Sequence, residues 1–155
     1  MSRARRHTPS FIREHSLSLA AGGILAVWIG LYAFSMPGTH LGSFFGNAIA
    51  DWSGVVVMVF ATKYLFEKGS AESRRPPTHL VHSVLNRLGD HSLSVFLVIT
   101  GLGWIALYAS MSSESKWGQV VGNIVSEWTQ ILGLVILTKR LIERGSKESS
   151  REEEA

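Results

Sequence analysis

Two carboxylates inside apolar stretches are the residues of this chain best placed to do chemistry. Asp51 and Glu127 each stand four residues after an asparagine, Asn47 and Asn123. A spacing of four places the two side chains of each pair on one face of a helix. Two carboxylates and two amides form an oxygen-rich set that suits a hard cation or a shared proton. We therefore treat Asn47, Asp51, Asn123 and Glu127 as a candidate ion or proton site.

A structural role is the alternative for the same side chains. Each acid is followed by a tryptophan, Trp52 or Trp128, and tryptophan is typical of the boundary between lipid and water. In that arrangement the acids lie at the outer headgroups and hydrogen bonds from asparagine join the helices. Lys63 and Lys139 then mark the opposite boundary. The residues alone leave both interpretations open.

The two acid pairs belong to an internal repeat. Residues 15–75 match residues 91–151 without a gap at a constant offset of 76. Roughly 23 of about 61 aligned positions are identical, which indicates duplication. Each copy contains two apolar segments, so the second copy starts on the same side of the membrane as the first, as in parallel repeats. Residues 76 positions apart are called counterparts below.

The apolar segments predict an all-α membrane protein with four transmembrane helices in two tandem hairpins. One crossing takes about 20 predominantly apolar residues. Hairpin 1 occupies residues 1–75 with spans at about 17–36 and 44–66, and hairpin 2 occupies 92–145 with spans at about 92–111 and 120–142. The basic start of the chain also fits a signal peptide. The counterpart of the first span lies inside the chain, which favours a retained span.

The segments outside the hairpins are polar. Residues 76–91 form a predicted linker, in which apolar residues at 80, 81, 84, 85 and 88 indicate a short amphipathic helix on the membrane surface, with a plain loop as the alternative. Residues 146–155 are charged and predict a disordered tail. Both segments are candidate binding sites for a cytoplasmic partner.

The distribution of basic residues predicts the orientation. All but one of the 15 Lys and Arg residues lie in the N-terminus, the linker or the C-terminus, or at the helix ends facing them. The exception is Lys116. Because loops rich in Lys and Arg stay in the cytoplasm, we expect both termini and the linker there.

Small and polar residues at matched positions predict local structure. Gly42 with Gly46, and Gly118 with Gly122, form GxxxG pairs, which let helices approach closely and predict helix packing. Ser16 and Ser92 precede the first and third spans and are expected to be N-caps. The small-residue faces also favour a homo-oligomer in the lipid bilayer.

Composition excludes several classes of function. Cysteine is absent, so disulfides and thiol chemistry are unavailable. The net charge is +3, but the basic residues flank apolar spans instead of lining a soluble face, which argues against nucleic-acid binding. P-loop, nucleophile-elbow and HExxH motifs are missing from the sequence. We expect no enzymatic activity, no cofactor and no metal site.

The ends of the hairpins carry matched motifs. They open with Glu14–Ser18 and Asp90–Ser94, and they close with Glu67–Ser73 and Glu143–Ser149. These motifs resemble an uncharacterised family of bacterial inner-membrane proteins built of two tandem transmembrane hairpins. The resemblance covers nearly the whole chain, with shorter outer turns here. It implies this architecture and an inner-membrane location, and it implies no activity.

Two functions are consistent with the sequence. The first is a non-catalytic structural or regulatory helix bundle. The second is a small oligomeric cation or proton channel or transporter that uses Asp51 and Glu127.

Overall fold

The computed structural model describes residues 11–67, 89–139 and 141. The described residues form five helices: α1 (Phe11–Glu14), α2 (Ser16–Phe34), α3 (His40–Tyr64), α5 (Ser92–Ser110) and α6 (Lys116–Leu137). All but α1 are long and apolar enough to cross a membrane, which confirms the prediction of an all-α protein with four such helices. The expected amphipathic helix in the linker and the expected disordered tail lie outside the described residues.

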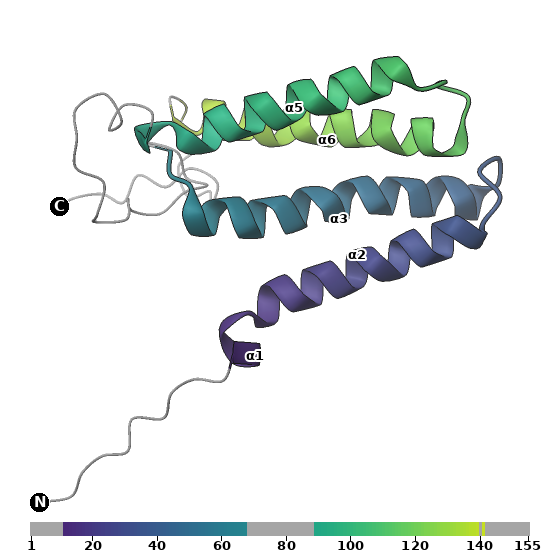
Figure 1. Cartoon of the computed structure of the whole chain (residues 1–155), viewed down its shortest axis with the longest axis horizontal. Coiled ribbons are helices and arrows are strands. Elements are labelled where there is room, and N and C mark those ends of the chain that lie inside the picture. Colours follow the sequence, from purple (N-terminus) through teal and green to yellow (C-terminus); the bar gives the residue numbers. More distant parts are fainter. Residues whose placement is uncertain (1–10, 68–88, 140, 142–155) are drawn as a thin grey trace, which may run out of the picture.

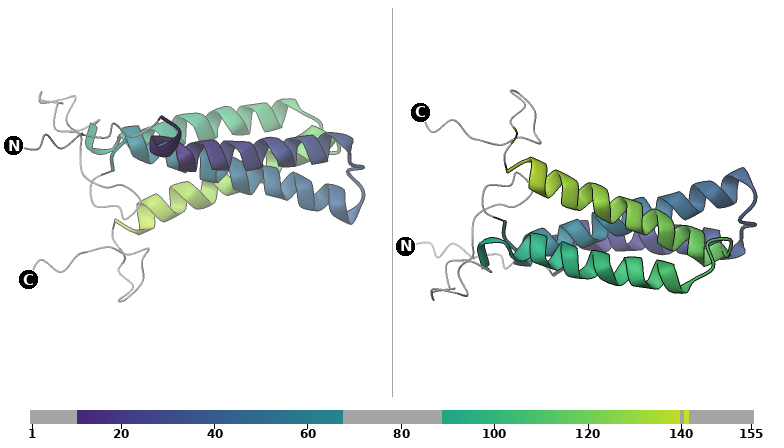
Figure 2. Two further views of the ribbon diagram at one scale, coloured as in Figure 1. Left: turned by 90° about the horizontal axis from the view of Figure 1, so that it is seen from below. Right: turned by 90° about the horizontal axis from the view of Figure 1, so that it is seen from above.

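The helices are arranged with α3 and α6 at the centre. Helix α2 packs on α3, α3 packs on α6, and α5 packs on α6. Figure 1 shows α3 between α2 and the pair formed by α5 and α6. Figure 2 shows α6 crossing α3. We call the end with the two short helix connections the turn end, and the opposite end, where α2 and α5 begin, the terminal end.

The two connections at the turn end are built alike. The side-chain oxygen of Thr39 accepts a hydrogen bond from Gly42 N at 3.1 Å, and that of Ser115 accepts one from Gly118 N at 3.0 Å. Such caps satisfy backbone donors that have no partner inside the helix. They make α3 and α6 begin at His40 and Lys116, before the spans expected to start near residues 44 and 120.

The core lies between the inner helices and α5. Leu93, Leu97 and Val135 are fully buried, and Ile131 is 9% exposed. By contrast, large apolar side chains on the outer faces are exposed, such as Phe34 and Leu102. In a bilayer these outer side chains contact lipid, so their exposure is compatible with a multi-pass membrane protein.

Candidate functional site

A row of polar side chains follows the line where α3 meets α6. We call it the polar seam, and it consists of Ser43, Asn47 and Asp51 from α3 with their counterparts Gln119, Asn123 and Glu127 from α6. Within each helix the three residues are four positions apart, so each set lies on one helical face.

One hydrogen bond joins the two helices within the seam. Asn123 Nδ2 donates to Asn47 Oδ1 at 2.5 Å. Both asparagines line a polar groove of about 450 Å³, together with Ser43, Gln119 and the exposed Tyr108. The two asparagines of the candidate ion site are therefore brought together at the helix interface.

The two carboxylates lie one helical turn further along the seam. Glu127 is half-buried over Gly54, where an added Cβ would stand 2.7 Å from Glu127 Oε1. Asp51 is exposed, and within the described part of the chain no hydrogen bond or ion pair reaches either carboxylate. At about 1.5 Å per residue, each acid lies about 16 Å from the start of its helix.

Beyond the carboxylates the seam becomes apolar. Four residues after Asp51 and Glu127 stand Val55 and Ile131, and four residues later stand Val59 and Val135. Val135 is fully buried. The polar groups therefore start near the turn end and stop near the middle of the helices. This arrangement can hold a proton or cation beside two acids, but it offers no polar route to the terminal end within one chain.

The GxxxG glycines make close contacts inside each hairpin. A Cβ added at Gly42 would collide with the carbonyl oxygen of Met36, and one at Gly118 with that of Ser112. A Cβ at Gly46 would lie 3.2 Å from the Tyr32 ring. At Gly122 the corresponding distance is 3.0 Å, to Tyr108. The first glycine of each pair therefore lets the helix start fit under its own turn, and the second receives the tyrosine of the preceding helix.

The two tryptophans have different surroundings. Trp128 is only 4% exposed, and its Nε1 donates to Thr100 Oγ1 at 2.8 Å. Its ring also contacts Trp104, with 5.7 Å between centroids. Trp52, the counterpart of Trp128, is half-buried. The counterpart of Thr100 in hairpin 1 is Ile24, so the hydrogen bond of Trp128 has no equivalent there. The structure thus places Trp128 between α5 and α6.

Lys116 joins the hairpins at the turn end. Its Nζ donates to Ala33 O at 3.0 Å and to Ser35 O at 2.7 Å. The hydroxyl of Tyr32 in turn donates to Lys116 O at 2.5 Å. Carbonyls at a helix C-terminus lack intrahelical partners and attract cations. Lys116 therefore caps α2 from the other hairpin.

An ionic cluster around the buried Glu67 joins the hairpins at the terminal end. Glu67 is fully buried, and its carboxylate forms an ion pair with Lys139 and lies 2.6 Å from His91 Nδ1. Its Oε2 accepts a hydrogen bond from Ser94 N at 2.9 Å. We call Glu67, His91 and Lys139 the Glu67 cluster. Ser92 was expected to be the N-cap of α5, but His91 occupies that position and forms no side-chain cap. Glu67 caps the start of α5 instead.

The hydrogen bonds of the cluster control the charge of Glu67. Burial alone would raise the pKa of the Glu67 carboxyl, but hydrogen bonds from Lys139, His91 and the Ser94 backbone hold that pKa below its ordinary value. A carboxylate with this many donors stays ionised at neutral pH. The cluster therefore ties the end of hairpin 1 to both helices of hairpin 2. Lys139, expected to be an interface anchor, is one of its members.

The counterparts of His91 and Lys139 are also in contact. Lys63 Nζ lies 3.3 Å from His15 Nδ1, and Lys139 Nζ lies 3.3 Å from His91 Nδ1. Lys63 is exposed. Sequence reasoning missed the Glu67 cluster, although one signal was present. The acid, the lysine and the His-Ser-Leu-Ser motif all occur in both copies of the repeat.

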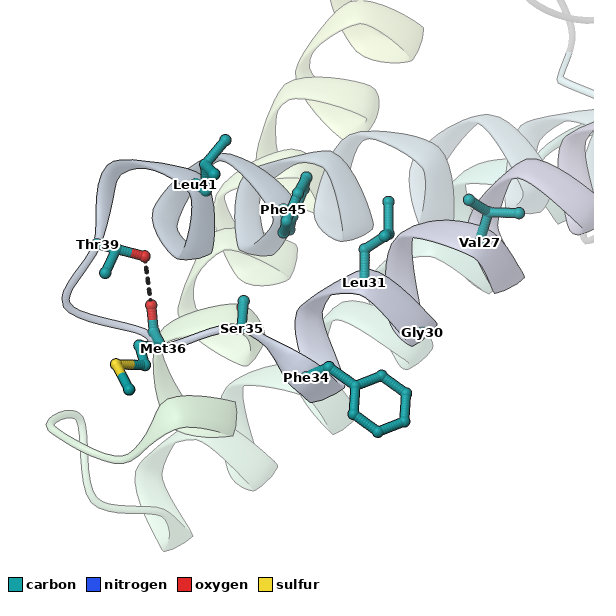
Figure 3. Close-up of a pocket in the computed structure, with 9 residues that line it drawn as sticks. All are labelled: Val27, Gly30, Leu31, Phe34, Ser35, Met36, Thr39, Leu41 and Phe45. Carbon is teal, nitrogen blue, oxygen red and sulfur yellow. Dashed lines mark hydrogen bonds between the residues drawn. The ribbon is translucent and has the colours of Figure 1, made fainter.

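An apolar groove on hairpin 1 offers little chemistry. Its volume is about 600 Å³ and its walls are mainly apolar. Figure 3 shows the side chains of Val27, Leu31 and Phe45 along it, with the hydrogen bond from Thr39 to the Met36 carbonyl near its end. Among the residues that the structure describes, no three His, Asp or Glu side chains are grouped as metal ligands.

Comparisons with known proteins add no relative. No family model, curated protein or solved structure matches the chain.

Proposed function

We propose that this chain is a non-catalytic, multi-pass protein of the bacterial inner membrane. In this proposal it acts as a structural or regulatory helix bundle and assembles with copies of itself through the polar seam. One observation carries the proposal. The polar seam is exposed at Asp51, but the residues that follow the two acids toward the terminal end are apolar. In channels, polar or charged groups select ions and hydrophobic constrictions close the path by excluding water, so a seam that is apolar over half of its length favours a closed bundle.

Matched contacts support two tandem hairpins. Ser35 N donates to Tyr32 O at 3.0 Å, and Met111 N donates to Tyr108 O at 3.1 Å. The caps, the glycine contacts and the lysine–histidine contacts described above occur in the same pairs of counterparts. In this proposal, the two hairpins are two copies of one unit, and both copies enter the membrane from the same side.

Charge supports the orientation with both termini in the cytoplasm. The terminal end holds Lys63 and Lys139, whereas the turn end holds Lys116. The cytoplasmic side is then the side of the Glu67 cluster, the linker and the tail. The resemblance of the hairpin motifs to inner-membrane proteins supports the location.

Asp51 supports self-association. It is exposed near the middle of α3, and a charged side chain facing lipid at that depth costs up to about 3 kcal/mol on insertion scales. The cost falls if the seam faces a second copy. The asparagines, Gln119 and the acids then find hydrogen-bonding partners across the contact.

A fluorescence experiment tests this assembly. Two preparations of the full chain, labelled with donor and acceptor dyes, are mixed in liposomes at increasing dilution in lipid. We expect energy transfer that decreases for Asp51→Leu combined with Gln119→Leu. The matched control is Glu114→Leu, which changes an exposed acid of the turn and leaves the transfer unchanged. Equal transfer for all variants would place the contact elsewhere, and no transfer for the wild type would refute self-association.

Asp51 also supports a second candidate function. In an oligomer, several copies of Asp51 and Glu127 would converge, and a path for cations or protons could form between the chains. This channel or transporter requires flux across the membrane, whereas the structural bundle requires none.

A further inference from the structure

The last turns of α2 and α5 are built alike but are covered differently. Ser35 N and Met111 N donate to the carbonyls of Tyr32 and Tyr108, which are counterparts. Each tyrosine ring packs on the second glycine of a GxxxG pair. Yet Tyr32 is 1% exposed, whereas Tyr108 is 38% exposed. The difference lies in what approaches each ring from the other hairpin.

A lysine ammonium covers the end of α2. Lys116 Nζ donates to Ala33 O at 3.0 Å and to Ser35 O at 2.7 Å, and it lies 4.8 Å from the centre of the Tyr32 ring. Carbonyls at a helix C-terminus and the face of an aromatic ring both attract cations. The hydroxyl of Tyr32 donates in turn to Lys116 O. Hairpin 1 therefore binds an ammonium and an oxygen acceptor side by side.

The corresponding groups of hairpin 2 have no such partner among the described residues. No cation lies over the Tyr108 ring there, and its hydroxyl forms no hydrogen bond. No described side chain donates to the carbonyls of Ala109 and Met111. The counterpart of Lys116 is His40, which is exposed. Hairpin 2 thus presents the same ring and carbonyls to a ligand from outside the chain.

We infer that the polar groove beside Tyr108 binds a primary ammonium joined to a phosphodiester, as in the headgroup of phosphatidylethanolamine. Tyr108 and Ser113, on either side of the two carbonyls in the sequence, line this groove of about 450 Å³, which is within the range of small-molecule sites. The ammonium donates to the carbonyls of Ala109 and Met111, as Lys116 does in hairpin 1. A phosphate oxygen accepts from the Tyr108 hydroxyl. A choline headgroup has no N–H, so it cannot donate to the carbonyls.

The rest of the groove suits a headgroup with both charges. Its other polar lining residues are Ser43, Asn47, Ser113, Gln119 and Asn123. Hydroxyl and amide groups accept hydrogen bonds from an ammonium and also donate them to phosphate oxygens. No lysine or arginine is among the described residues that line the groove, and Asp51 and Glu127 lie one helical turn beyond the asparagines. The groove therefore attracts the ammonium and disfavours a free anion.

The place of the groove agrees with a lipid headgroup. It lies at the turn end, where the long helices reach the boundary of the proposed membrane, and tyrosine is frequent at that level. Each break in the described chain is at the other end, such as those after Glu67 and before Gly89 (Figure 1). A basic residue beyond a break would have to cross a hydrocarbon core of about 30 Å to reach the groove. The inference rests on the membrane location proposed above, and it does not depend on self-association.

Native mass spectrometry of the full chain in detergent tests the inference. The protein is titrated with dioleoyl phosphatidylethanolamine and, separately, with the choline lipid that has the same acyl chains. The variant is Tyr108→Phe, which keeps the ring and removes the hydroxyl. The matched control is Tyr32→Phe, which removes the counterpart hydroxyl outside the groove. Circular dichroism shows that each variant is folded.

We expect the wild type to bind the ethanolamine lipid about tenfold more tightly than the choline lipid, because only the first donates charged hydrogen bonds to the carbonyls. Tyr108→Phe should weaken binding of the ethanolamine lipid by about 3- to 10-fold, the effect of one lost hydrogen bond. Tyr32→Phe should bind it like the wild type. Equal affinity of the wild type for both lipids would overturn the inference, and so would a Tyr108→Phe variant that binds the ethanolamine lipid as tightly as the wild type.

A competition experiment identifies the source of the headgroup. Glycerophosphoethanolamine is the same headgroup without acyl chains. If it displaces the lipid, the groove takes the free headgroup, and if it does not, the membrane lipid is the ligand; either result supports the site. The measured masses also count the chains in each complex, so self-association is read separately from lipid binding. Recovery of the protein in the soluble fraction without detergent would contradict the membrane location itself.

Discussion

Asn123 donates a 2.5 Å hydrogen bond to Asn47, its own counterpart in the other hairpin. Interhelical hydrogen bonds in membranes contribute about 0.6 kcal/mol on average and up to about 1.7 kcal/mol. We expect Asn47→Ala and Asn123→Ala each to lower the free energy of unfolding by about 1 kcal/mol. The double variant should lose little more than either single variant, because the bond is already absent. Reversible unfolding in bicelles measures this, with Thr129→Ala as a control that removes a bond inside α6 only. Additive losses would mean that the asparagines do not interact.

Tyr32 and Tyr108 form a second matched pair with different roles. Tyr32 is 1% exposed and donates to Lys116 O, whereas Tyr108 is 38% exposed. Tyr32→Phe should cost about 1 kcal/mol of unfolding free energy, because the buried hydrogen bond to Lys116 is lost. Tyr108→Phe should be close to neutral. Equal effects of the two substitutions would contradict the asymmetric packing at the turn end.

Gly118 predicts a steric effect. An alanine there would place its Cβ against the Ser112 carbonyl, which is backbone and cannot move aside cheaply. We expect Gly118→Ala to cost about 1–3 kcal/mol. Gly103→Ala is the matched control, because an added Cβ there meets nothing within 4 Å. It should be neutral, or stabilising by up to about 1 kcal/mol through better helix propensity. A neutral Gly118→Ala would show that the turn does not close over the start of α6.

Glu67→Gln should weaken the terminal end. The substitution leaves Lys139 without its ionic partner in a partly buried position, and we expect a loss of about 1–3 kcal/mol. Hydrogen exchange of the amides at the start of α5 should increase most, because Glu67 caps Ser94 N. Glu114→Gln, at an exposed turn residue, is the control. A change in exchange spread evenly over all helices would indicate general destabilisation instead of a lost cap.

The same carboxylate predicts a pH dependence. In the folded protein the pKa of Glu67 is below its ordinary value, because the hydrogen bonds outweigh the effect of burial. The unfolded chain has a glutamate pKa of about 4.3. The stabilisation is therefore fully present above that pH and is lost as the pH falls through the lower, folded-state pKa. Unfolding free energies of wild type and Glu67→Gln measured between neutral and acidic pH should converge toward the acidic end. A difference that is independent of pH would contradict an ionised Glu67.

The sequence predicted the helices and the seam better than it predicted the contacts between hairpins. Uncharged runs of about 20 residues indicate spanning helices by length alone, and a spacing of four places Asn47 and Asp51 on one face. Helix α3 begins before the expected span, because Thr39 caps it earlier than the charge pattern suggests. The hydrogen bond of Trp128 could not be predicted from the sequence, because its partner, Thr100, is in a different helix. The Glu67 cluster was missed for the same reason, since His91 and Lys139 are distant from Glu67 in sequence.

The most direct test of the central claim is a measurement of ion flux in proteoliposomes. Cation and proton flux are compared for the wild type, Asp51→Asn/Glu127→Gln and the control Glu114→Gln, with an ionophore added at the end to show that the vesicles are sealed. A structural bundle predicts no flux above that of empty liposomes for any of the three proteins. Flux in the wild type and the control that disappears in a folded Asp51→Asn/Glu127→Gln variant would contradict the claim and identify the polar seam as a transport path.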